Sequence, residues 1–517
     1  VAGRYPVRPA LITAGDGSIT FGDLWDRVSR ASTGLRRLGL APGDRAVVMV
    51  PMSIDLYVAM LAVLHMGAVA VFVDPWIGRR QIAAFAAFAE PRAWIGIPLS
   101  HVLRLLSPRL RSIPLSVTTG WRLGPLPAGC TLDELEASEG DGEVHPASPD
   151  DPALITFTSG SSGEPKGANR THGFLLAQHR ALAAEFPAED SDVDMPMFPV
   201  FALNNLATGV PSVVPDMDFR RVDQVDGARI LAQMRRHGVT TCTASPPFFD
   251  RLAKRRGEIP NLRRILTGGA PVSEAQLRDW RRAFPETGIL VAYGSTEAEP
   301  VAHLTAEERL EAVNLDRPLT PGFCAGPPVE RVRAKIVRIH DGPIQLGSAG
   351  WAGWELPAGE IGELVVTGEH VCRDYYRNPQ AVRENKIVDG EAVWHRMGDT
   401  GSFDREGRFW LAGRVHSTIR RAGGLVHPQL VEQAACAEDP RIRRAAAVGL
   451  PDGSGGERVV LVLETAEEGI EPEVAARLRA AGLEVDEIRL TSDPLPVDPR
   501  HNSKIDYPRL RERLLKG

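Results

Sequence analysis

The chain has 517 residues, with 60 Lys and Arg against 66 Asp and Glu and a formal net charge of −6. The length suggests roughly two to four domains, and the mild charge argues against a dedicated nucleic-acid binder, which would carry a basic stripe. Hydrophobic residues make up 43% and charged residues 24% of the chain, which argues against global disorder.

Five cysteines lie at positions 130, 242, 324, 372 and 436, and no pair has metal or redox spacing. A disulfide scaffold is therefore not expected. The most apolar stretch, Val47 to Val73, is interrupted by Asp55, His65 and Gly67, so we read it as strand, helix and strand and not as a membrane span. The first ten residues lack an apolar signal segment. We expect a cytoplasmic protein.

The first hundred residues alternate helical and strand patterns. Apolar residues recur at helical spacing from Leu24 to Leu38, and Thr20 with Asp23 is typical of an N-terminal cap. A strand at Ala46–Val50, a helix at 55–66, a strand at Ala68–Val73 and a packed helix near 80–90 are expected next. Short apolar strands separated by helices predict a mostly parallel sheet covered on both faces.

The predicted pattern of secondary structure changes along the rest of the chain. Strands are expected at Ala153–Phe157 and Ile289–Ala292, with a helix from His172. From Gly362 onward, short strands joined by turns predict antiparallel hairpins. After about 415 the pattern becomes β-α-β, with elements at Ala445–Gly449, Val459–Glu464, 472–481 and Val485–Leu490. The predicted fold class is α/β, with a large N-terminal domain (1–415) of mixed sheets covered by helices and a small α+β C-terminal domain (416–517).

The segment TSGSSGEPKG, residues 158–167, is the most informative in the chain. Glycines let the backbone curl so that several N–H groups face one anion, and hydroxyls and a lysine add donors and charge. The spacing is not that of the P-loop, since Lys166 is followed by glycine. We expect a triphosphate-binding loop between a strand and a helix, formed by Thr158, Ser159, Gly160, Ser161, Ser162, Gly163 and Lys166.

This loop resembles the phosphate-binding loop of the acyl-adenylate-forming superfamily, and four further motifs of that superfamily follow in order. They are TGGAP at 267–271, YGSTE at 293–297, MGDTG at 397–401 and Gly413-Arg414 before a hinge, with Lys504 where the superfamily has its catalytic lysine. The resemblance spans nearly the whole chain. It implies ATP and Mg²⁺ as cofactors and a mobile C-terminal lid that carries Lys504.

The resemblance also assigns roles to individual residues. Lys504, Glu297 and Thr296 would be catalytic, with Glu297 as the metal ligand. The adenosine would be bound by Gly268, Gly269, Ala270, Tyr293, Gly294, Ser295, Asp399 and Arg414. These roles make chemical sense, because a carboxylate that attacks the α-phosphorus of ATP brings anions together, and a metal and a lysine offset their repulsion. A carboxylate at 399 can accept two hydrogen bonds from vicinal ribose hydroxyls.

Three segments are similar to the β-lactone synthetases of bacterial olefin biosynthesis. They are residues 196–204, residues 213–218 and the ending LPVDPRHNSKI at 495–505. Ala202 stands where many acyl-CoA synthetases have a histidine, and His416 stands where many relatives have the hinge aspartate. The resemblance implies adenylation of a 3-hydroxy fatty acid and closure to a β-lactone with release of AMP and pyrophosphate.

Two alternatives stay open. A fatty acyl-CoA synthetase or fatty acyl-AMP ligase would use the same scaffold. A non-catalytic nucleotide or acyl sensor is disfavoured because the lysine, the glutamate and the aspartate are all present. The implied partner is a small-molecule 3-hydroxy acid. No nucleic-acid partner and no membrane span are expected. Association with other enzymes of the same pathway is left open.

The acyl pocket is predicted from aromatic residues near strand ends, where ligands of α/β sheets bind. The candidates are Phe198, Phe201, Phe248 and Phe249, although ordinary core packing is the competing interpretation for each. His303 and His172 are candidates for proton transfer from a hydroxyl, with a structural histidine as the favoured interpretation.

Overall fold

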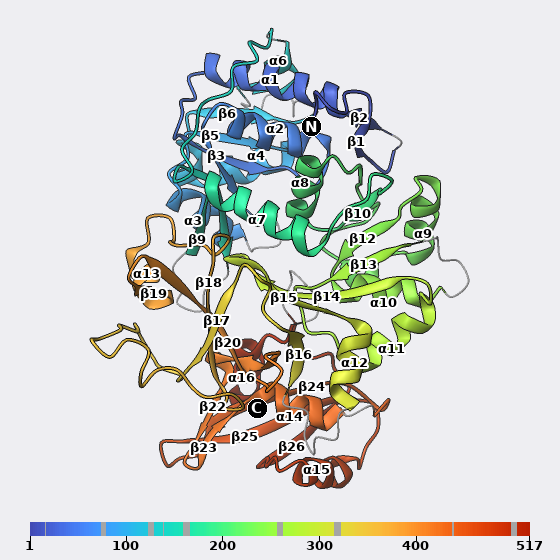
Figure 1. The fold of residues 1–517 in the computed structure, drawn as a ribbon, viewed down its shortest axis with the longest axis vertical. Helices are drawn as coiled ribbons and strands as arrows, with labels where there is room; N and C mark the ends of the chain where they lie inside the picture. Colours follow the sequence, from blue (N-terminus) through green and yellow to red (C-terminus); the bar gives the residue numbers. More distant parts are fainter. Residues whose placement is uncertain are drawn as a thin grey trace.

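The structure is a computed structural model. It describes residues 1–15, 17–73, 79–121, 129–137, 139–158, 166–255, 262–314, 322–436, 439–497 and 504–516. The chain runs from an N-terminal unit at the top of Figure 1 through two further sheets to a small C-terminal unit at the bottom.

In the described ranges, seven strands form the first sheet, in the order β7-β6-β5-β3-β4-β8-β9. The strands pair in parallel from β7 to β8, and β9 runs antiparallel at the edge. The strands are β3 (Arg45–Met49), β4 (Val69–Phe72), β5 (Ala93–Gly96), β6 (Leu115–Thr118), β7 (Cys130–Thr131), β8 (Pro152–Thr158) and β9 (Lys166–Thr171).

Helices cover this sheet. Helix α1 (Phe21–Arg37) begins at Thr20, whose hydroxyl accepts from Asp23 N–H, as the sequence predicted. The apolar face of α1 packs with the nearly all-buried α2 (Ile54–His65). The other helices of the unit are α3 (Arg79–Phe88), α4 (Pro98–Leu106), α5 (Pro108–Arg111), α6 (Leu132–Glu136) and α7 (His172–Glu185).

The second sheet has eight strands among the residues described, in the order β15-β14-β13-β12-β10-β11-β1-β2. They are β1 (Pro9–Ile12), β2 (Ser18–Thr20), β10 (Asp194–Pro196), β11 (Ser212–Val213), β12 (Thr241–Ala244), β13 (Arg264–Thr267), β14 (Gly288–Ser295) and β15 (Ala298–Thr305). The helices of this unit are α8 (Pro199–Thr208), α9 (Gly227–Arg236), α10 (Pro246–Ala253), α11 (Glu274–Ala283) and α12 (Ala306–Asn314), with a short 3₁₀ turn at Val222–Gln224.

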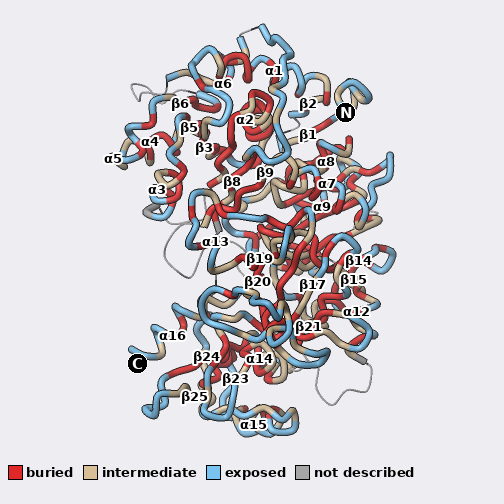
Figure 2. The backbone as a smooth tube through the Cα atoms, turned by 60° about the vertical axis from the view of Figure 1, so that its left-hand side comes forward, coloured by how far each residue is buried: buried red, intermediate tan, exposed pale blue. Residues whose placement is uncertain are grey.

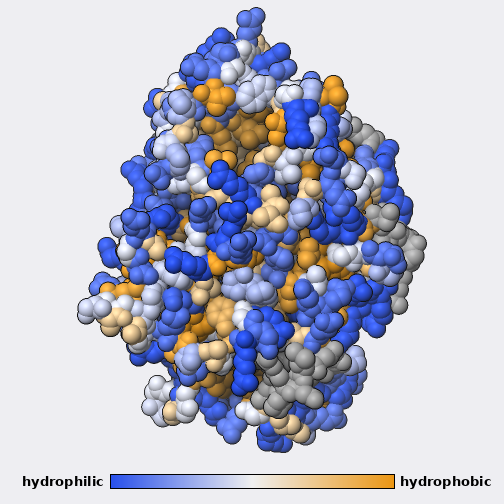
Figure 3. All heavy atoms as spheres, in the orientation of Figure 1, coloured by the Kyte–Doolittle hydropathy of each residue, from blue (hydrophilic) through white to orange (hydrophobic). Residues whose placement is uncertain are grey.

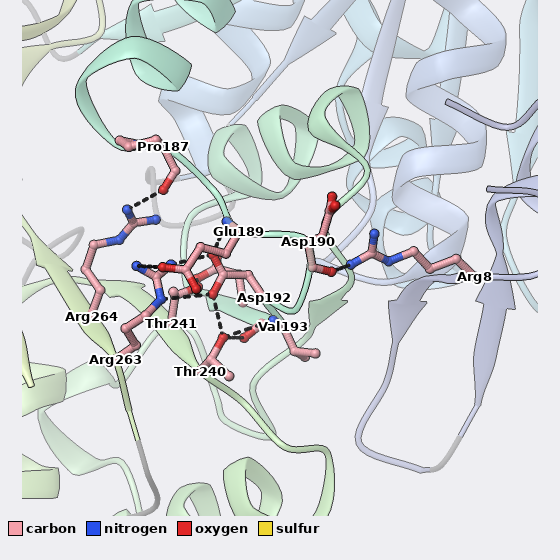
Figure 4. Close-up of polar contacts among 11 residues, drawn as sticks. Arg8, Pro187, Glu189, Asp190, Asp192, Val193, Thr240, Thr241, Arg263 and Arg264 are labelled. Atoms are coloured by element: carbon pink, nitrogen blue, oxygen red, sulfur yellow. Dashed lines mark hydrogen bonds and ion pairs between the residues drawn. The ribbon is translucent and has the colours of Figure 1, made fainter. Parts of the chain in front are cut away.

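A group of hydrogen bonds and ion pairs connects the residues just before strands β10, β12 and β13 (Figure 4). The Asp192 carboxylate accepts from Arg263 at 2.5 Å and from the Thr240 hydroxyl at 2.9 Å. Arg264 donates to Pro187 O at 2.8 Å, and Arg8 donates to Asp190 O. These bonds tie the segment after α7 to β12, β13 and the N-terminal strand.

The third sheet is antiparallel, as expected from Gly362 onward. Over the described residues it contains β16 (Phe323–Gly326), β17 (Arg333–Val337), β18 (Gly362–Thr367), β19 (Lys386–Asp389), β20 (Ala392–Phe403) and β21 (Phe409–Arg414), with α13 (Pro379–Asn385) beside it. A 3₁₀ turn at Val415–Ser417 follows β21.

The C-terminal unit has its own core. Strands β24 (Ile442–Pro451) and β25 (Glu457–Thr465) form an antiparallel hairpin, and β26 (Glu487–Thr491) joins β25 in parallel. Strands β22 (Ile419–Arg421) and β23 (Gly424–Val426) form a second hairpin. The helices are α14 (Pro428–Cys436), α15 (Glu471–Ala480) and α16 (Tyr507–Lys516).

Burial follows these layers. The buried tube segments concentrate along the strands and the inner helices, and α15 and α16 are mostly exposed (Figure 2). The face shown in Figure 3 is predominantly hydrophilic, with apolar residues visible mainly in recesses. No described helix is long and apolar enough to cross a membrane.

Candidate active site

A cavity of about 2460 Å³ lies where the three sheets and the C-terminal unit meet. Its wall contains residues from motifs that are far apart in the sequence. These are Lys166, Gly268, Gly269, Ala270, Tyr293, Gly294, Ser295, Thr296, Glu297, Asp399, Arg414 and Lys504. The described part of the chain therefore brings the residues singled out by the resemblance to one place.

The predicted phosphate loop connects β8 to β9. Thr158 and Lys166 are paired residues of this antiparallel ladder, so the last ladder pair closes the loop at its base. The helix predicted from His172 is confirmed as α7, but a strand that was not predicted, β9, lies between the loop and that helix. The predicted ligands Ser159, Gly160, Ser161, Ser162 and Gly163 lie outside the described residues.

Glu297 lies in the tight turn between β14 and β15. Its carboxylate is buried, and Oε1 accepts a hydrogen bond from the Tyr375 hydroxyl at 3.0 Å. Burial raises the pKa of Tyr375, so its hydroxyl stays a donor. On the other side of the turn, the buried Arg170 of β9 donates to Thr296 O at 2.7 Å.

The segment Val371–Tyr376 connects this turn to the exit of the phosphate loop. Cys372 N–H donates to Glu297 O at 2.7 Å, and Tyr376 N–H donates to Gly167 O at 2.8 Å. Isolated bridges pair Ala298 with Val371 and Ala168 with Tyr375. We call this segment the clip. No motif in the sequence marks this segment.

Lys386 supports the clip from β19. Its ammonium is buried, donates to Cys372 O and lies 5.0 Å from the centre of the Tyr375 ring. Burial lowers the pKa of Lys386.

Asp399 forms the second polar centre of the cavity. Its Oδ2 accepts from the Tyr293 hydroxyl at 2.6 Å, and its Oδ1 accepts from Arg414 Nη1 at 2.7 Å. Burial, together with the Asp399 charge, raises the pKa of Tyr293 well above its ordinary value. The Asp399 charge likewise raises the pKa of Arg414. Because β20 and β21 pair Asp399 directly with Arg414, the contact is built into the sheet register.

The glycines of the predicted adenine motifs allow close backbone approach. A Cβ on Gly268 would lie 2.8 Å from Ala292 O, and Gly269 has a φ of +82°, which favours glycine. The following helix α11 begins with a capping box between Ser273 and Gln276. The loop is thereby held against the end of β14, on the wall of the cavity.

Apolar residues also line the cavity, among them Met60, Phe72, Phe85, Leu154, Phe198 and Phe201, and we refer to these six together as the apolar arm. Phe198 and Phe201 were predicted for it. Phe248 and Phe249 are not on its wall: both are fully buried in the core of the second sheet, and Phe249 packs 5.7 Å from Trp280. They occupy the inner face of α10, so the competing interpretation of core packing applies to them.

The histidines are placed differently from one another. His303 pairs with Glu185 at 2.8 Å and packs against Phe186, and neither it nor His172 is on the cavity wall. His416 does line the cavity, with a pKa lowered by burial and by Arg414. Ala202 is buried in the core.

Lys504 reaches the cavity from the C-terminal unit. Its segment is fixed by a bridge between Val497 and Ile505 and by Asp506 N–H, which donates to Pro496 O at 2.9 Å. Tyr507 then donates to the half-buried Glu432 carboxylate at 2.9 Å, so α14 anchors the start of α16. Burial raises the pKa of Glu432 to about 7.

The donor set suits a metal that is bound together with a nucleotide. No group of three or more His, Cys, Asp or Glu side chains able to hold a metal occurs among the residues described. Glu297 offers one carboxylate, and Oε1 is already engaged by Tyr375. Mg²⁺ is commonly held by one or two carboxylates plus substrate phosphates, so the residues fit such an ion.

Residues 1–376 match the family described as AMP-binding enzyme, and the chain belongs to that family. The protein is therefore an adenylate-forming enzyme. It is 36% identical over 518 residues, 96% of this chain and 92% of the relative, to an olefin beta-lactone synthetase of Stenotrophomonas maltophilia.

Solved structures share the whole fold. The amide bond synthetase McbA from Marinactinospora thermotolerans matches with a TM-score of 0.81 and 24% identity, over 98% of this chain and 97% of that chain. The o-succinylbenzoate coenzyme A synthetase of Bacillus subtilis, in complex with ATP and magnesium ion, matches with a TM-score of 0.78 and 20% identity, over 99% and 98% of the two chains.

Proposed function

We propose that this protein adenylates a 3-hydroxy fatty acid with ATP and closes the acyl-adenylate to a β-lactone. The observation that carries the proposal is the 36% identity over nearly the full length to an olefin beta-lactone synthetase. The apolar arm of the cavity and the polar centres around Glu297 and Asp399 are of the kind that such a substrate pair needs.

The first step joins the acid to AMP. A carboxylate oxygen of the acid attacks the α-phosphorus of ATP, the bond to the bridging oxygen breaks, and pyrophosphate leaves. We assign the ribose hydroxyls to Asp399, the adenine to Tyr293 and the loop at 268–270, and the phosphates to residues 158–166. Glu297 would hold Mg²⁺, which offsets the negative charge of the phosphates when bound.

Lys504 is proposed to stabilise the charge that develops at the α-phosphate. An ammonium at such a centre acts as a fixed electrostatic group. Its place on a separate C-terminal unit would let that unit act as a lid, with residues 1–415 as the nucleotide- and acid-binding domain and 416–517 as the mobile domain.

The second step is intramolecular. The 3-hydroxyl oxygen attacks the activated carbonyl carbon, the hydroxyl proton passes to solvent, and the bond between that carbon and the phosphate oxygen breaks as AMP leaves. Because the nucleophile is tethered to the carbon that it attacks, it has a high effective concentration, and no thiol acceptor is needed.

The deciding experiment is a single-turnover assay of a long-chain 3-hydroxy fatty acid and the matching acid without the hydroxyl, each with and without coenzyme A. We expect β-lactone from the hydroxy acid regardless of coenzyme A, and bound acyl-AMP from the plain acid. The Lys504→Ala variant serves as the control for enzyme-dependent product. Steady acyl-CoA formation from the plain acid, with no lactone from the hydroxy acid, would instead identify an acyl-CoA synthetase.

A further inference from the structure

Helix α4 buries its polar residues and leaves two of its leucines exposed. Ser100, His101 and Arg104 are buried, whereas Leu99 and Leu106 are 70% and 68% exposed. The inward polar groups have partners: Ser100 accepts from Trp94 Nε1 at 3.2 Å, and His101 Nε2 lies 3.1 Å from Val117 O. The helix is thus fixed in an orientation that leaves large apolar side chains outside.

Two of the exposed side chains lie on one face of α4. Leu99 and Leu106 are seven residues apart, two turns of a helix, and so lie on the same face. Trp121 is 70% exposed. Thr119 N–H donates to Gly96 O at 3.0 Å, so the chain leaving β6 emerges next to the residues that lead into α4. We call Leu99, Leu106 and Trp121 the α4 face.

The sequence that contains α4 has more basic than acidic residues, although Arg104 of α4 is buried and Arg92 pairs with Asp44 at 3.4 Å. Between residues 75 and 132 the chain has seven arginines and a single acidic residue, Glu90, although the whole chain carries a net charge of −6. Arg109 and Arg111 are exposed directly after α4, beside Leu106. Two exposed arginines therefore follow the exposed Leu106 closely in the sequence.

This combination has a specific physical partner. Tryptophan and leucine side chains enter the boundary between lipid headgroups and acyl chains, and flanking arginines are attracted to anionic headgroups. We propose that the α4 face docks on the surface of an anionic lipid bilayer. The docking is interfacial, in keeping with the absence of a spanning helix among the described residues.

Docking through the α4 face would bring the bilayer near a helix that lines the active-site cavity. Helices α3, α4 and α5 lie along one edge of the N-terminal unit (Figure 2), and α3 packs against α5. Gln81 and Phe85 of α3 also line the active-site cavity. A bound bilayer would therefore lie beside the helix that borders the apolar arm. Such a position would allow an acyl substrate to pass from the bilayer to the cavity. That delivery rests on the proposed function, whereas the docking itself does not.

The test is co-sedimentation of the full chain with vesicles in the absence of substrate. Vesicles of phosphatidylcholine mixed with phosphatidylglycerol should bind the protein at least about tenfold more tightly than vesicles of phosphatidylcholine alone, and added salt should reduce the difference. The variant Leu99→Ser/Leu106→Ser should bind the anionic vesicles about tenfold more weakly. Arg109→Gln/Arg111→Gln should remove most of the preference for phosphatidylglycerol.

The matched control is Leu176→Ser, which changes a leucine of α7 that is 54% exposed and lies outside the α4 face; its vesicle binding should equal that of the unchanged protein. Circular dichroism checks that each variant is folded. The proposal is overturned if the protein does not sediment with anionic vesicles, or if the leucine and arginine variants bind as tightly as the unchanged protein. It is also overturned if the leucine variant only abolishes self-association in light scattering, which would assign the face to a second copy of the chain.

Discussion

Replacing Tyr375 by phenylalanine removes one hydroxyl and keeps the ring beside Lys386. The structure gives this hydroxyl one role, a 3.0 Å hydrogen bond to Oε1 of the buried Glu297 carboxylate. A hydrogen bond to a charged group contributes about 1.5–3 kcal/mol. Its loss leaves Oε1 without this donor and frees the carboxylate to rotate away from the orientation that leaves its other oxygen for a metal.

The expected effect lies in metal-dependent nucleotide binding. Part of the hydrogen-bond energy is lost in the ligand-free protein as well, so we expect the lower end of the range: about a tenfold fall in affinity for ATP with magnesium, which corresponds to about 1.4 kcal/mol. Affinity for ATP in the presence of a chelator should not change, because Tyr375 contacts the proposed metal ligand and is not assigned to the nucleoside.

Isothermal titration calorimetry with ATP, with and without magnesium, measures both quantities. Tyr376→Phe is the matched control, because that neighbouring tyrosine packs against the apolar cluster around Phe85. The reasoning fails if Tyr375→Phe binds ATP with magnesium as tightly as the unchanged protein. It also fails if affinity falls equally with and without the metal, since that would indicate a general disturbance of the cavity.

The remaining predictions concern the other polar centres. Lys504→Ala should reduce pyrophosphate release by about 100-fold or more while leaving ATP affinity nearly unchanged; release at the normal rate would refute the assigned role. Asp399→Ala should weaken ATP binding more than acid binding, and unchanged ATP affinity in calorimetry would contradict the ribose assignment. Burial raises the pKa of Glu432 from 4.5 to about 7, so its contribution to stability is complete below pH 4.5 and is lost as the pH rises through about 7. Urea unfolding should show the free energy of unfolding decreasing over that interval, with a flatter profile in Glu432→Gln.

Much of the fold could be predicted because local signals agreed with tertiary structure. The cap at Thr20 and the apolar spacing from Leu24 predicted α1 with its correct start. The antiparallel region after Gly362 followed from its turns. Strand β9 was missed because its sequence, KGANRT, has no apolar alternation; its buried Arg170 is stabilised by contacts with Thr296 that only the folded chain supplies.

The candidate site, like the fold, could be predicted only in part. Motifs with glycines and charged residues at fixed spacing indicated which residues lie on the cavity wall. The clip carries no such pattern, since its contacts to Glu297 and Gly167 run mostly through backbone groups. Phe248 and Phe249 could not be separated from Phe198 and Phe201 in advance, because an aromatic residue near a strand end is equally suited to a core and to a pocket.

The contact between Asp399 and Arg414 connects the proposed ribose site to the point where the chain passes into the C-terminal unit. Arg414 is the last residue of β21, and the C-terminal unit begins a few residues later. If ribose hydroxyls bind Asp399 as proposed, they compete with Arg414 for Oδ1 and with Tyr293 for Oδ2. Nucleotide binding and the orientation of the C-terminal unit are then thermodynamically linked. Linkage is reciprocal: if the nucleotide changes the equilibrium between two orientations by some factor, holding the unit in one orientation changes the affinity for the nucleotide by the same factor.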